Sequence, residues 1–434
     1  MTEQFAHPAA TSLWANTADP PPRLPRLCAD LSADIAIVGG GYTGLSAAHA
    51  LAQRGIRPVV LEANAIGWGA SGRNGGVVSL KFRIPFSDIA KSYGLDTARR
   101  MHRIGHDAVD VVEELVSEFD INSAQFERTG SLRCAHTARA RAAIVAEAEW
   151  LRAALGDRSM SILSREQVAE ETGSRAFAGG VLTSGSGTLH PLNYVRGIAA
   201  GLAARGVDIF EGSPVLRIKR EPNGLVIETP AGTVRAKQAI IATNAYSDLT
   251  PATRYLKRTL IPFRSAIIAT ERLPAELERK LMVARRGYSE TRRMMRWFRK
   301  VDGRVIFGGR GAFGKEDAPS AFTALQRAMV SLFPELEGMR IAFKWSGYVG
   351  MTLDQVPHVG RLDERICFAV GYNGAGVAMA SLLGRYAAAF AAGETPEVAL
   401  LDAARLQPVP CYPLREAGVR LVAGWYQFLD AIGR

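Results

Sequence analysis

The sequence is poor in features that would place it outside the cell or across a membrane. Its four cysteines, Cys28, Cys134, Cys367 and Cys411, form neither a CxxC pair nor a spacing suited to a metal. Separated thiols are typical of a reducing compartment. No uninterrupted apolar run reaches the length of a membrane span, and residues 1–10 lack the apolar segment of a signal peptide. We therefore expect a cytoplasmic protein.

Two further absences narrow the function. The formal net charge is +11, yet no basic block with interleaved aromatic residues is present, so nucleic acid is not expected as a partner. A solvated basic surface is the simpler interpretation, although a positive field would also favour an anionic cofactor and an acidic substrate. No Ser/His/Asp set and no pair of carboxylates stands out. The sequence therefore assigns no side-chain base.

The chain is organised around residues 34–45, where apolar residues lead into a glycine cluster and then into a helical pattern. Gly39, Gly41 and Gly44 have the G-x-G-x-x-G spacing of a dinucleotide-binding unit. The first glycine permits the turn, the second admits a pyrophosphate, and the third lets helix and strand pack closely. The helix N-terminus offers unpaired N–H groups to the pyrophosphate. This pattern predicts a strand, a tight turn and a helix that bind a nucleotide.

An acidic residue in the next predicted strand supports this interpretation. Glu62 ends the run Arg57–Ala63, roughly twenty residues after the first glycine, where an acid binds a ribose hydroxyl. No arginine stands beside it to accept a 2′-phosphate, which argues against NADP. FAD and NAD remain.

A second glycine-rich stretch, the 67–76 loop, holds five glycines with Ser71, Arg73 and Asn74 between them. Glycine at this density lets a backbone press against a flat or charged group. A merely flexible loop is the alternative, but such a loop has no need of Arg and Asn. We expect a loop that contacts the cofactor, with Arg73 on a phosphate or on the flavin ring.

A third transition lies far along the chain. The buried strand predicted at Ile366–Val370 opens into the glycine turn 371–377, and a helix follows through Phe390. A second helix N-terminus aimed at the same ligand would suit the anionic end of a reduced flavin. Between the two turns, Asp302-Gly303 joins two β-rich runs and predicts a hairpin in the sheet of a second domain, a wall of the substrate cavity.

Two histidines raise the question of a metal site. His102 and His106 lie four residues apart in the amphipathic helix predicted over Ser87–Phe119. They could share one face and bind a metal, but no third ligand is near in the sequence. We interpret them as an exposed pair and predict no metal.

The two ends of the chain have a different composition from the rest. Prolines at 20–22 and at position 25 exclude helix from residues 1–30 and predict an irregular arm that lies across the body, with Trp14 as a packing anchor. The segment Arg415–Phe428 has apolar residues at helical spacing beside basic ones. A helix packed against the body is favoured; a helix lying on a bilayer is the alternative.

Taken together, these residues resemble the D-amino-acid-oxidase-like (DAO) family of FAD-dependent amine and amino-acid oxidoreductases. The similarity covers Asp34–Ala391, and within the family the Ser-Gly-Arg-Asn-Gly-Gly loop and the N-terminal arm look most like those of γ-glutamylputrescine oxidases. The stretches that carry it are Ile37–Leu45, Glu62, Gly69–Gly76, Ala242–Ala245 and Gly371–Gly376.

The resemblance implies an α/β fold of the glutathione-reductase-like DAO type. A Rossmann-like FAD-binding domain would stand beside an α+β, sheet-rich substrate domain. The predicted ranges are an N-terminal arm at 1–30, an FAD-binding domain at 31–85, 179–250 and 345–405, a substrate domain at 86–178 and 251–344, and a C-terminal extension at 406–434.

FAD is the cofactor that the resemblance implies. The residues expected to contact it are Gly39, Gly41, Tyr42, Thr43, Gly44, Glu62, Ala63, Gly69, Ser71, Arg73, Asn74, Gly75, Val215, Thr243, Asn244, Gly347, Gly374, Ala375, Gly376 and Val377. The residues expected in the substrate cavity are Arg73, Trp297, Arg299 and Tyr348.

The family's chemistry is oxidation of a C–N bond by hydride transfer to flavin N5, followed by hydrolysis of the imine. Relatives with covalent FAD have a cysteine where Gly347 stands, so non-covalent FAD is predicted. Sarcosine-oxidase-like relatives have a carboxylate-binding lysine where Ala378 stands, which favours a longer small-molecule amine, such as a γ-glutamylated polyamine. O2 is the expected electron acceptor. The alternatives are a dehydrogenase that reduces a quinone at the membrane and a non-metabolic flavoprotein such as an RNA-modifying enzyme.

Overall fold

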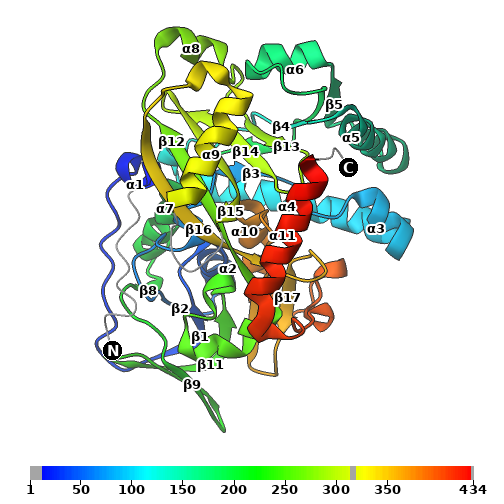
Figure 1. Cartoon of the computed structure of the whole chain (residues 1–434). Helices are drawn as coiled ribbons and strands as arrows, with labels where there is room; N and C mark the ends of the chain where they lie inside the picture. Colours follow the sequence, from blue (N-terminus) through cyan, green and yellow to red (C-terminus); the bar gives the residue numbers. More distant parts are fainter. Residues whose placement is uncertain (1–11, 313–318, 432–434) are drawn as a thin grey trace.

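The computed structural model describes residues 12–312 and 319–431, and their strands form two eight-stranded sheets and one two-stranded sheet. The first large sheet lies in the lower part of Figure 1 and the second in the upper part. The helices are α1 (Leu13–Thr17), α2 (Tyr42–Ala52), α3 (Phe86–Tyr93), α4 (Leu95–Glu118), α5 (Ala138–Trp150), α6 (Arg165–Thr172), α7 (Pro191–Ala204), α8 (Ala275–Lys280), α9 (Pro319–Leu332), α10 (Gly376–Ala391) and α11 (Arg415–Ala431).

The first sheet is the predicted nucleotide-binding sheet. Its order is β17 (His358–Arg361), β18 (Ile366–Val370), β11 (Thr233–Ile241), β1 (Leu31–Val38), β2 (Pro58–Leu61) and β8 (Asp208–Phe210), with the hairpin β9 (Arg217–Glu221) and β10 (Gly224–Glu228) beside β11. Strand β1 runs parallel to both β2 and β11, and β18 runs parallel to β11. The carboxyl ends of these strands therefore meet at one edge.

Strand β1 is apolar because both of its faces are covered. Ile37 packs in the core shared with α2 and α10, whereas Val38 packs in a separate core on the opposite face. A parallel sheet buried on both faces reads as a continuous apolar run rather than an alternating one. This arrangement confirms the predicted α/β fold.

The second sheet has the order β16 (Ile341–Met351), β12 (Ile261–Thr270), β15 (Arg304–Ala312), β14 (Arg296–Val301), β13 (Gly287–Glu290), β4 (Ser131–Cys134), β6 (Gly180–Thr183) and β5 (Met160–Leu163). A separate two-stranded sheet pairs β3 (Val77–Val78) with β7 (Gly187–Thr188). Asp302-Gly303 joins β14 to β15, as predicted. Aromatic rings pack in the core beside the second sheet. The ring of Phe298 stacks on that of Tyr288, with centroids 5.4 Å apart, and on that of Phe307, with centroids 6.0 Å apart.

Two strands of this sheet lie outside the range predicted for the substrate domain. Strand β6 and most of β16 fall in segments that the sequence assigns to the FAD-binding domain, yet both pair within the second sheet. We therefore propose that residues 180–183 and 341–351 belong to the substrate domain.

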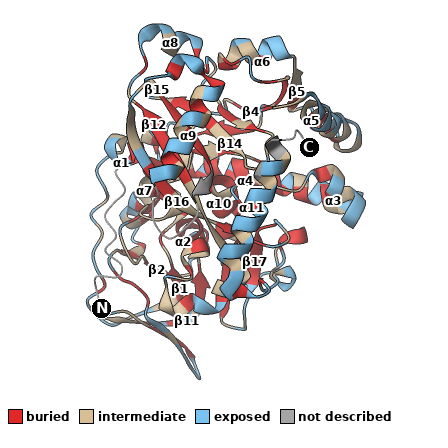
Figure 2. Ribbon diagram, in the orientation of Figure 1, coloured by how far each residue is buried: buried red, intermediate tan, exposed pale blue. Residues whose placement is uncertain are grey.

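The predictions for two helical segments need correction. The arm is not wholly irregular: Leu13–Thr17 is helical, because Ser12 caps the helix before the prolines begin. The helix predicted over residues 87–119 is broken at Gly94, whose φ of +87° ends α3. Helix α11 packs against the body with one side only, and most of its apolar residues lie elsewhere: Leu421 and Trp425 are 74% and 56% exposed. Much of α11 is accordingly coloured as exposed in Figure 2.

The orientation of α11 explains this exposure. Ala423 is buried and Val419, one turn earlier, is half-buried, so this side of the helix faces the body. Leu421, Trp425 and Phe428 lie on another side and remain in solvent. Within residues 12–312 and 319–431, no helix has both the length and the apolar composition needed to cross a bilayer.

Candidate functional site

A cavity of about 620 Å³ opens where the turns of the first sheet face strands of the second. Its volume lies within the range of small-molecule sites. Every residue predicted to contact FAD lines it except Gly44, and Trp297 and Tyr348 of the predicted substrate cavity line it as well. The structure therefore brings together residues spread over more than three hundred positions of sequence. Their individual contacts with a cofactor remain predictions.

The first glycine turn has the geometry that its spacing predicts. Gly39 has a φ of +109°, in the region that favours glycine. A Cβ on Gly41 would lie 2.8 Å from Ser71 Oγ, and a Cβ on Gly44 would lie 1.9 Å from the Gly39 carbonyl oxygen. Gly44 therefore acts by packing, which explains why it does not line the cavity. The N-cap residue of helix α2, Gly41, has no side chain to cap it; Ser71 Oγ accepts from the Tyr42 N–H at 3.1 Å, and the helix end opens into the cavity where a pyrophosphate would lie.

Glu62 lies beside this turn, at the end of β2, and lines the cavity. Its carboxylate accepts hydrogen bonds from the backbone N–H groups of Gly40 at 2.8 Å and Asn64 at 2.9 Å. Burial raises the pKa of the Glu62 carboxyl, while these two hydrogen bonds act in the opposite direction. A fixed acceptor at this position fits a ribose hydroxyl.

In the 67–76 loop, Arg73 and Asn74 hold the backbone as well as line the cavity. Arg73 Nε donates to the Trp68 carbonyl oxygen at 2.6 Å, and its guanidinium lies over the Trp68 ring. The Asn74 amide nitrogen donates to the carbonyl oxygens of Ala70 and Ser71, and its oxygen accepts from the Gly76 N–H. The loop is thus a folded structure with its own internal bonds.

Two buried tryptophans support this loop from outside the cavity. Trp14 Nε1 donates to the Asn74 carbonyl oxygen at 2.8 Å, and Trp345 Nε1 donates to the Arg73 carbonyl oxygen at 2.9 Å. The two indoles are themselves in edge contact, with centroids 6.3 Å apart. The prediction of Trp14 as a packing anchor is confirmed, whereas the role of Trp345 was missed. No local pattern could have found it, because its partner lies 272 residues away.

The second glycine turn meets the first directly. Tyr372 and Thr43 share a hydrogen bond between their hydroxyl groups at 2.5 Å, which joins the turn before α10 to the start of α2. Helix α10 likewise begins with no capping side chain, and Gly374 has a φ of +100° with open space around it. Asn244 accepts a hydrogen bond from the Gly371 N–H at 2.9 Å. Two helix N-termini at one cavity fit an elongated ligand that carries negative charge at two separate points.

The predicted substrate residues divide into two kinds. Trp297 lies so close to the loop that a Cβ on Gly75 would come within 2.5 Å of its ring. Tyr348 accepts a hydrogen bond from Arg264 Nη2 at 2.9 Å. Arg299, however, is not among the residues that line this cavity, so its assignment to substrate stays a prediction. It is buried behind the loop, where Nη1 donates to the carbonyl oxygens of Gly75, Gly76 and Leu189.

Sequence reasoning missed a group of charged residues on the far wall. Arg133 lies on β4 and Glu290 on β13 of the second sheet, Arg292 and Arg293 follow β13, and Lys81 follows β3 of the two-stranded sheet. Removal from bulk water, together with the nearby Arg133, lowers the pKa of Lys81 to about 7. The side chain of Glu290 is fully buried and pairs with Arg292 Nε at 2.7 Å. These charged residues come close together only because the strands pair in the folded structure, which the sequence alone does not show.

The two histidines of α4 also differ from expectation. They are half-buried rather than exposed, and Asp157 reaches them from another segment. The expectation that no third ligand lies nearby is therefore wrong, because Asp157 Oδ2 lies 2.9 Å from His102 Nε2 although 55 residues separate the two in the sequence.

Comparison with known proteins gives concordant results. Residues 34–390 match a family model described as FAD dependent oxidoreductase (DAO). The chain is 31% identical over 431 residues to γ-glutamylputrescine oxidoreductase of Escherichia coli K12, covering 98% of this chain and 99% of that one. It is 30% identical over 405 residues to a probable oxidoreductase, OrdL, of Haemophilus influenzae, covering 92% of each. The crystal structure of glycine oxidase from Geobacillus kaustophilus superposes with a TM-score of 0.71 at 21% identity, covering 86% of this chain and 99% of that one.

Proposed function

Because this chain belongs to the DAO family of FAD-dependent oxidoreductases, we propose that it oxidises a C–N bond of an amine or amino-acid-type substrate, with a γ-glutamylated polyamine as the substrate class. The observation that carries the proposal is the charged wall of the cavity. Such a substrate has an ammonium group and a carboxylate far apart. Arg292 or Arg293 would pair with the carboxylate, whereas Glu290 is already paired with Arg292 within the wall.

The residues of the first sheet would hold the cofactor and those of the second would place the substrate. When bound, FAD would supply the oxidant for the C–N bond by hydride transfer; water would hydrolyse the imine product, and O2 would take up the electrons. Trp297 and the 67–76 loop lie close together, and they would exclude water from the part of the cavity between the Trp297 ring and the loop. The chain need only orient an uncharged amine, which agrees with the lack of an assigned base.

A panel of amines tests this proposal. The purified flavoprotein is mixed anaerobically with γ-glutamylputrescine, putrescine, sarcosine and glycine, and the visible absorbance of oxidised flavin is followed. We expect the γ-glutamylated amine to bleach the flavin fastest. Failure of every amine to bleach it would contradict the proposed reaction, and faster bleaching by glycine would contradict only the substrate class.

Non-covalent attachment is part of the proposal. Gly347 lines the cavity where a linking cysteine would stand, and among the described residues no cysteine lines it. Acid precipitation of the holoenzyme is therefore expected to leave the flavin in the supernatant. A yellow pellet would contradict this expectation.

Glu62→Gln is expected to weaken FAD binding roughly tenfold. The amide keeps one acceptor oxygen and loses the other, and a hydrogen bond to a charged group is worth about 1.5–3 kcal/mol. The measurement is titration of the apoenzyme with FAD, read by flavin fluorescence. Glu211→Gln is the matched control, since Glu211 accepts from the Ile66 N–H and does not line the cavity. Equal weakening in both variants would contradict a direct role for Glu62.

Lys81 is expected to make the KM of a cationic amine depend on pH near neutrality. Because its pKa is lowered to about 7, the side chain is charged below pH 7 and repels the substrate, and it becomes neutral above pH 7. KM should fall by roughly tenfold across this range, which corresponds to about 1.4 kcal/mol of repulsion between two unit charges at intermediate dielectric. Lys81→Met should remove this step.

The control for this profile is Lys91→Met, because Lys91 is exposed and pairs with Asp88 on the surface. It should keep the wild-type profile. Any rise of kcat/KM at higher pH that reflects the substrate amine itself should persist in all three proteins. A step near pH 7 that survives in Lys81→Met would show that another group causes it.

One observation favours a second candidate, an amine dehydrogenase that delivers electrons to a quinone at a membrane. The exposed face of α11 carries Leu421, Val422, Trp425 and Phe428, and an apolar face of this kind suits a lipid surface. Peroxide release under air supports the oxidase. Turnover only with a quinone dye, together with flotation of the enzyme on lipid vesicles, would support the dehydrogenase.

A further inference from the structure

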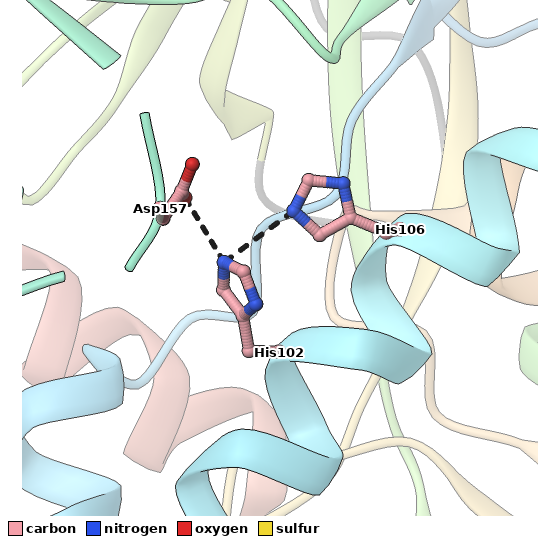
Figure 3. A group of neighbouring side chains, drawn as sticks. All are labelled: His102, His106 and Asp157. Carbon is pink, nitrogen blue, oxygen red and sulfur yellow. Dashed lines mark hydrogen bonds and ion pairs between the residues drawn. The ribbon is translucent and has the colours of Figure 1, made fainter. Parts of the chain in front are cut away.

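Outside the cavity, three side chains from two segments bring metal-binding atoms together (Figure 3). His102 and His106 lie one turn apart on α4, and Asp157 follows the π-helical turn Leu151–Leu155. One nitrogen or oxygen atom of each residue lies within 4.8 Å of the other two. We propose that these residues bind a divalent transition-metal ion of the zinc type, with water completing the coordination.

The distances suit such an ion. His102 Nε2 lies 2.9 Å from Asp157 Oδ2 and 3.4 Å from His106 Nε2. In a tetrahedral zinc site with Zn–N and Zn–O distances of about 2.0–2.2 Å, neighbouring ligand atoms are about 3.3 Å apart. Histidines at positions i and i+4 of a helix present their rings on one face, an arrangement also used by helical zinc sites. Two imidazoles and a carboxylate match the ligand preference of zinc.

Hydrogen bonding alone does not account for the arrangement. The bond from His102 to Asp157 is of ordinary length, but the 3.4 Å between the two Nε2 atoms exceeds the usual range for a nitrogen donor, about 2.7–3.2 Å. The two rings nevertheless lie with centroids 4.6 Å apart. An ion between them would draw on both lone pairs at once.

Neighbouring groups orient the side chains that would bind the ion. The side chain of Asp157 is only 4% exposed, and its Oδ1 accepts a hydrogen bond from the Ser159 N–H at 2.7 Å, which leaves Oδ2 facing the histidines. Both rings are half-buried, which leaves a route for the ion and its waters.

The bound ion would have a structural role. It would tie α4 to the segment between the π-helical turn and β5, both within the predicted substrate domain. A Cβ placed on Gly185 would lie 3.6 Å from the His106 ring and 2.9 Å from Leu80, so Gly185 stands between His106 and the residue before Lys81 of the cavity wall. The site therefore supports that wall from behind without entering the cavity, and its existence does not depend on the proposed reaction.

The test uses the holoenzyme, freed of metal on a chelating resin and then dialysed against zinc chloride. Zinc is measured by mass spectrometry after gel filtration, and thermal melting is recorded with zinc and with EDTA. We expect about one zinc per wild-type chain and a higher melting temperature in zinc. Asp157→Asn and His106→Ala should each weaken zinc binding roughly 100-fold or more, since loss of even an outer-shell partner costs 10- to 100-fold.

Asp96→Asn is the matched control, because Asp96 is an exposed carboxylate in the first turn of the same helix. It should bind zinc as the wild type does. Asp157→Asn keeps an oxygen that can accept from His102, so its fold should survive, and unchanged flavin absorbance would verify this. If Asp157→Asn fails to fold, the same zinc content and melting measurements are made on the milder variant His106→Gln. Zinc content and melting that do not differ between the wild type and these ligand variants would overturn the proposal.

Discussion

Replacing Gly44 by alanine is expected to give a protein that retains almost no flavin. The new Cβ would lie 1.9 Å from the Gly39 carbonyl oxygen, and a backbone atom cannot turn aside as a flexible side chain can. Helix α2 would have to shift away from the turn, and its N-terminal N–H groups would no longer face the pyrophosphate. Overpacking of this kind costs about 1–3 kcal/mol and occasionally more.

The measurement is the visible flavin absorbance of the purified protein relative to its protein absorbance, together with its melting temperature. Gly418→Ala is the control: it lies in α11, and a Cβ there would meet no atom within 4 Å. The control should match the wild type in both measurements. Wild-type flavin content in Gly44→Ala would show that the turn can rearrange at no cost.

Arg299→Met is expected to lower the free energy of unfolding by about 3 kcal/mol. The guanidinium is buried, and its Nη1 serves three carbonyl oxygens at the foot of the 67–76 loop. Methionine fills much of the volume but removes this donor from the carbonyl oxygens of Gly75 and Leu189, whereas the Gly76 oxygen still accepts from the Leu189 N–H; each buried unsatisfied group costs about 1–3 kcal/mol. Burial lowers the pKa of Arg299 to about 10, so the native side chain is still charged at neutral pH.

Urea unfolding measures this loss. The control is Arg272→Met, since Arg272 is exposed and pairs with Asp302 at the surface, where a salt bridge is worth less than about 1 kcal/mol. Arg299→Met should also lose flavin more readily, because the loop it supports lines the cavity. If Arg299 instead bound substrate, the variant would raise KM and leave unfolding unchanged.

Sequence reasoning succeeds in this chain where the signal is local. The turn at Gly39, the loop around Arg73 and the hairpin at Asp302 each depend on neighbours within a few residues, and each forms as predicted. Glycine at a positive φ and an Asp-Gly pair between β-rich runs leave few alternatives. The strands then bring the predicted residues to one edge, because parallel strands share a direction.

Prediction from the sequence fails in this chain where the two residues that contact each other are far apart in the sequence. Trp297 and Arg299 are two residues apart on β14, and a strand's period of two places them on the same face. Nothing local reveals that one ring lines the cavity while the next side chain passes behind the loop to reach Leu189. Asp157 is likewise separated from His102 by 55 residues. Such contacts follow from the packing of elements, which a single sequence does not display.

The hydrogen bond from Trp14 to the 67–76 loop has a practical consequence for preparing the enzyme. The proline segment that follows α1 is largely exposed and so open to proteases. A cut there would separate the tryptophan's helix from the rest of the chain, and the loop would lose one of its two indole supports. We expect stored samples to lose flavin, and with it their yellow colour, as the amino terminus is cleaved. The flavin content of a sample therefore reports whether this segment is still attached.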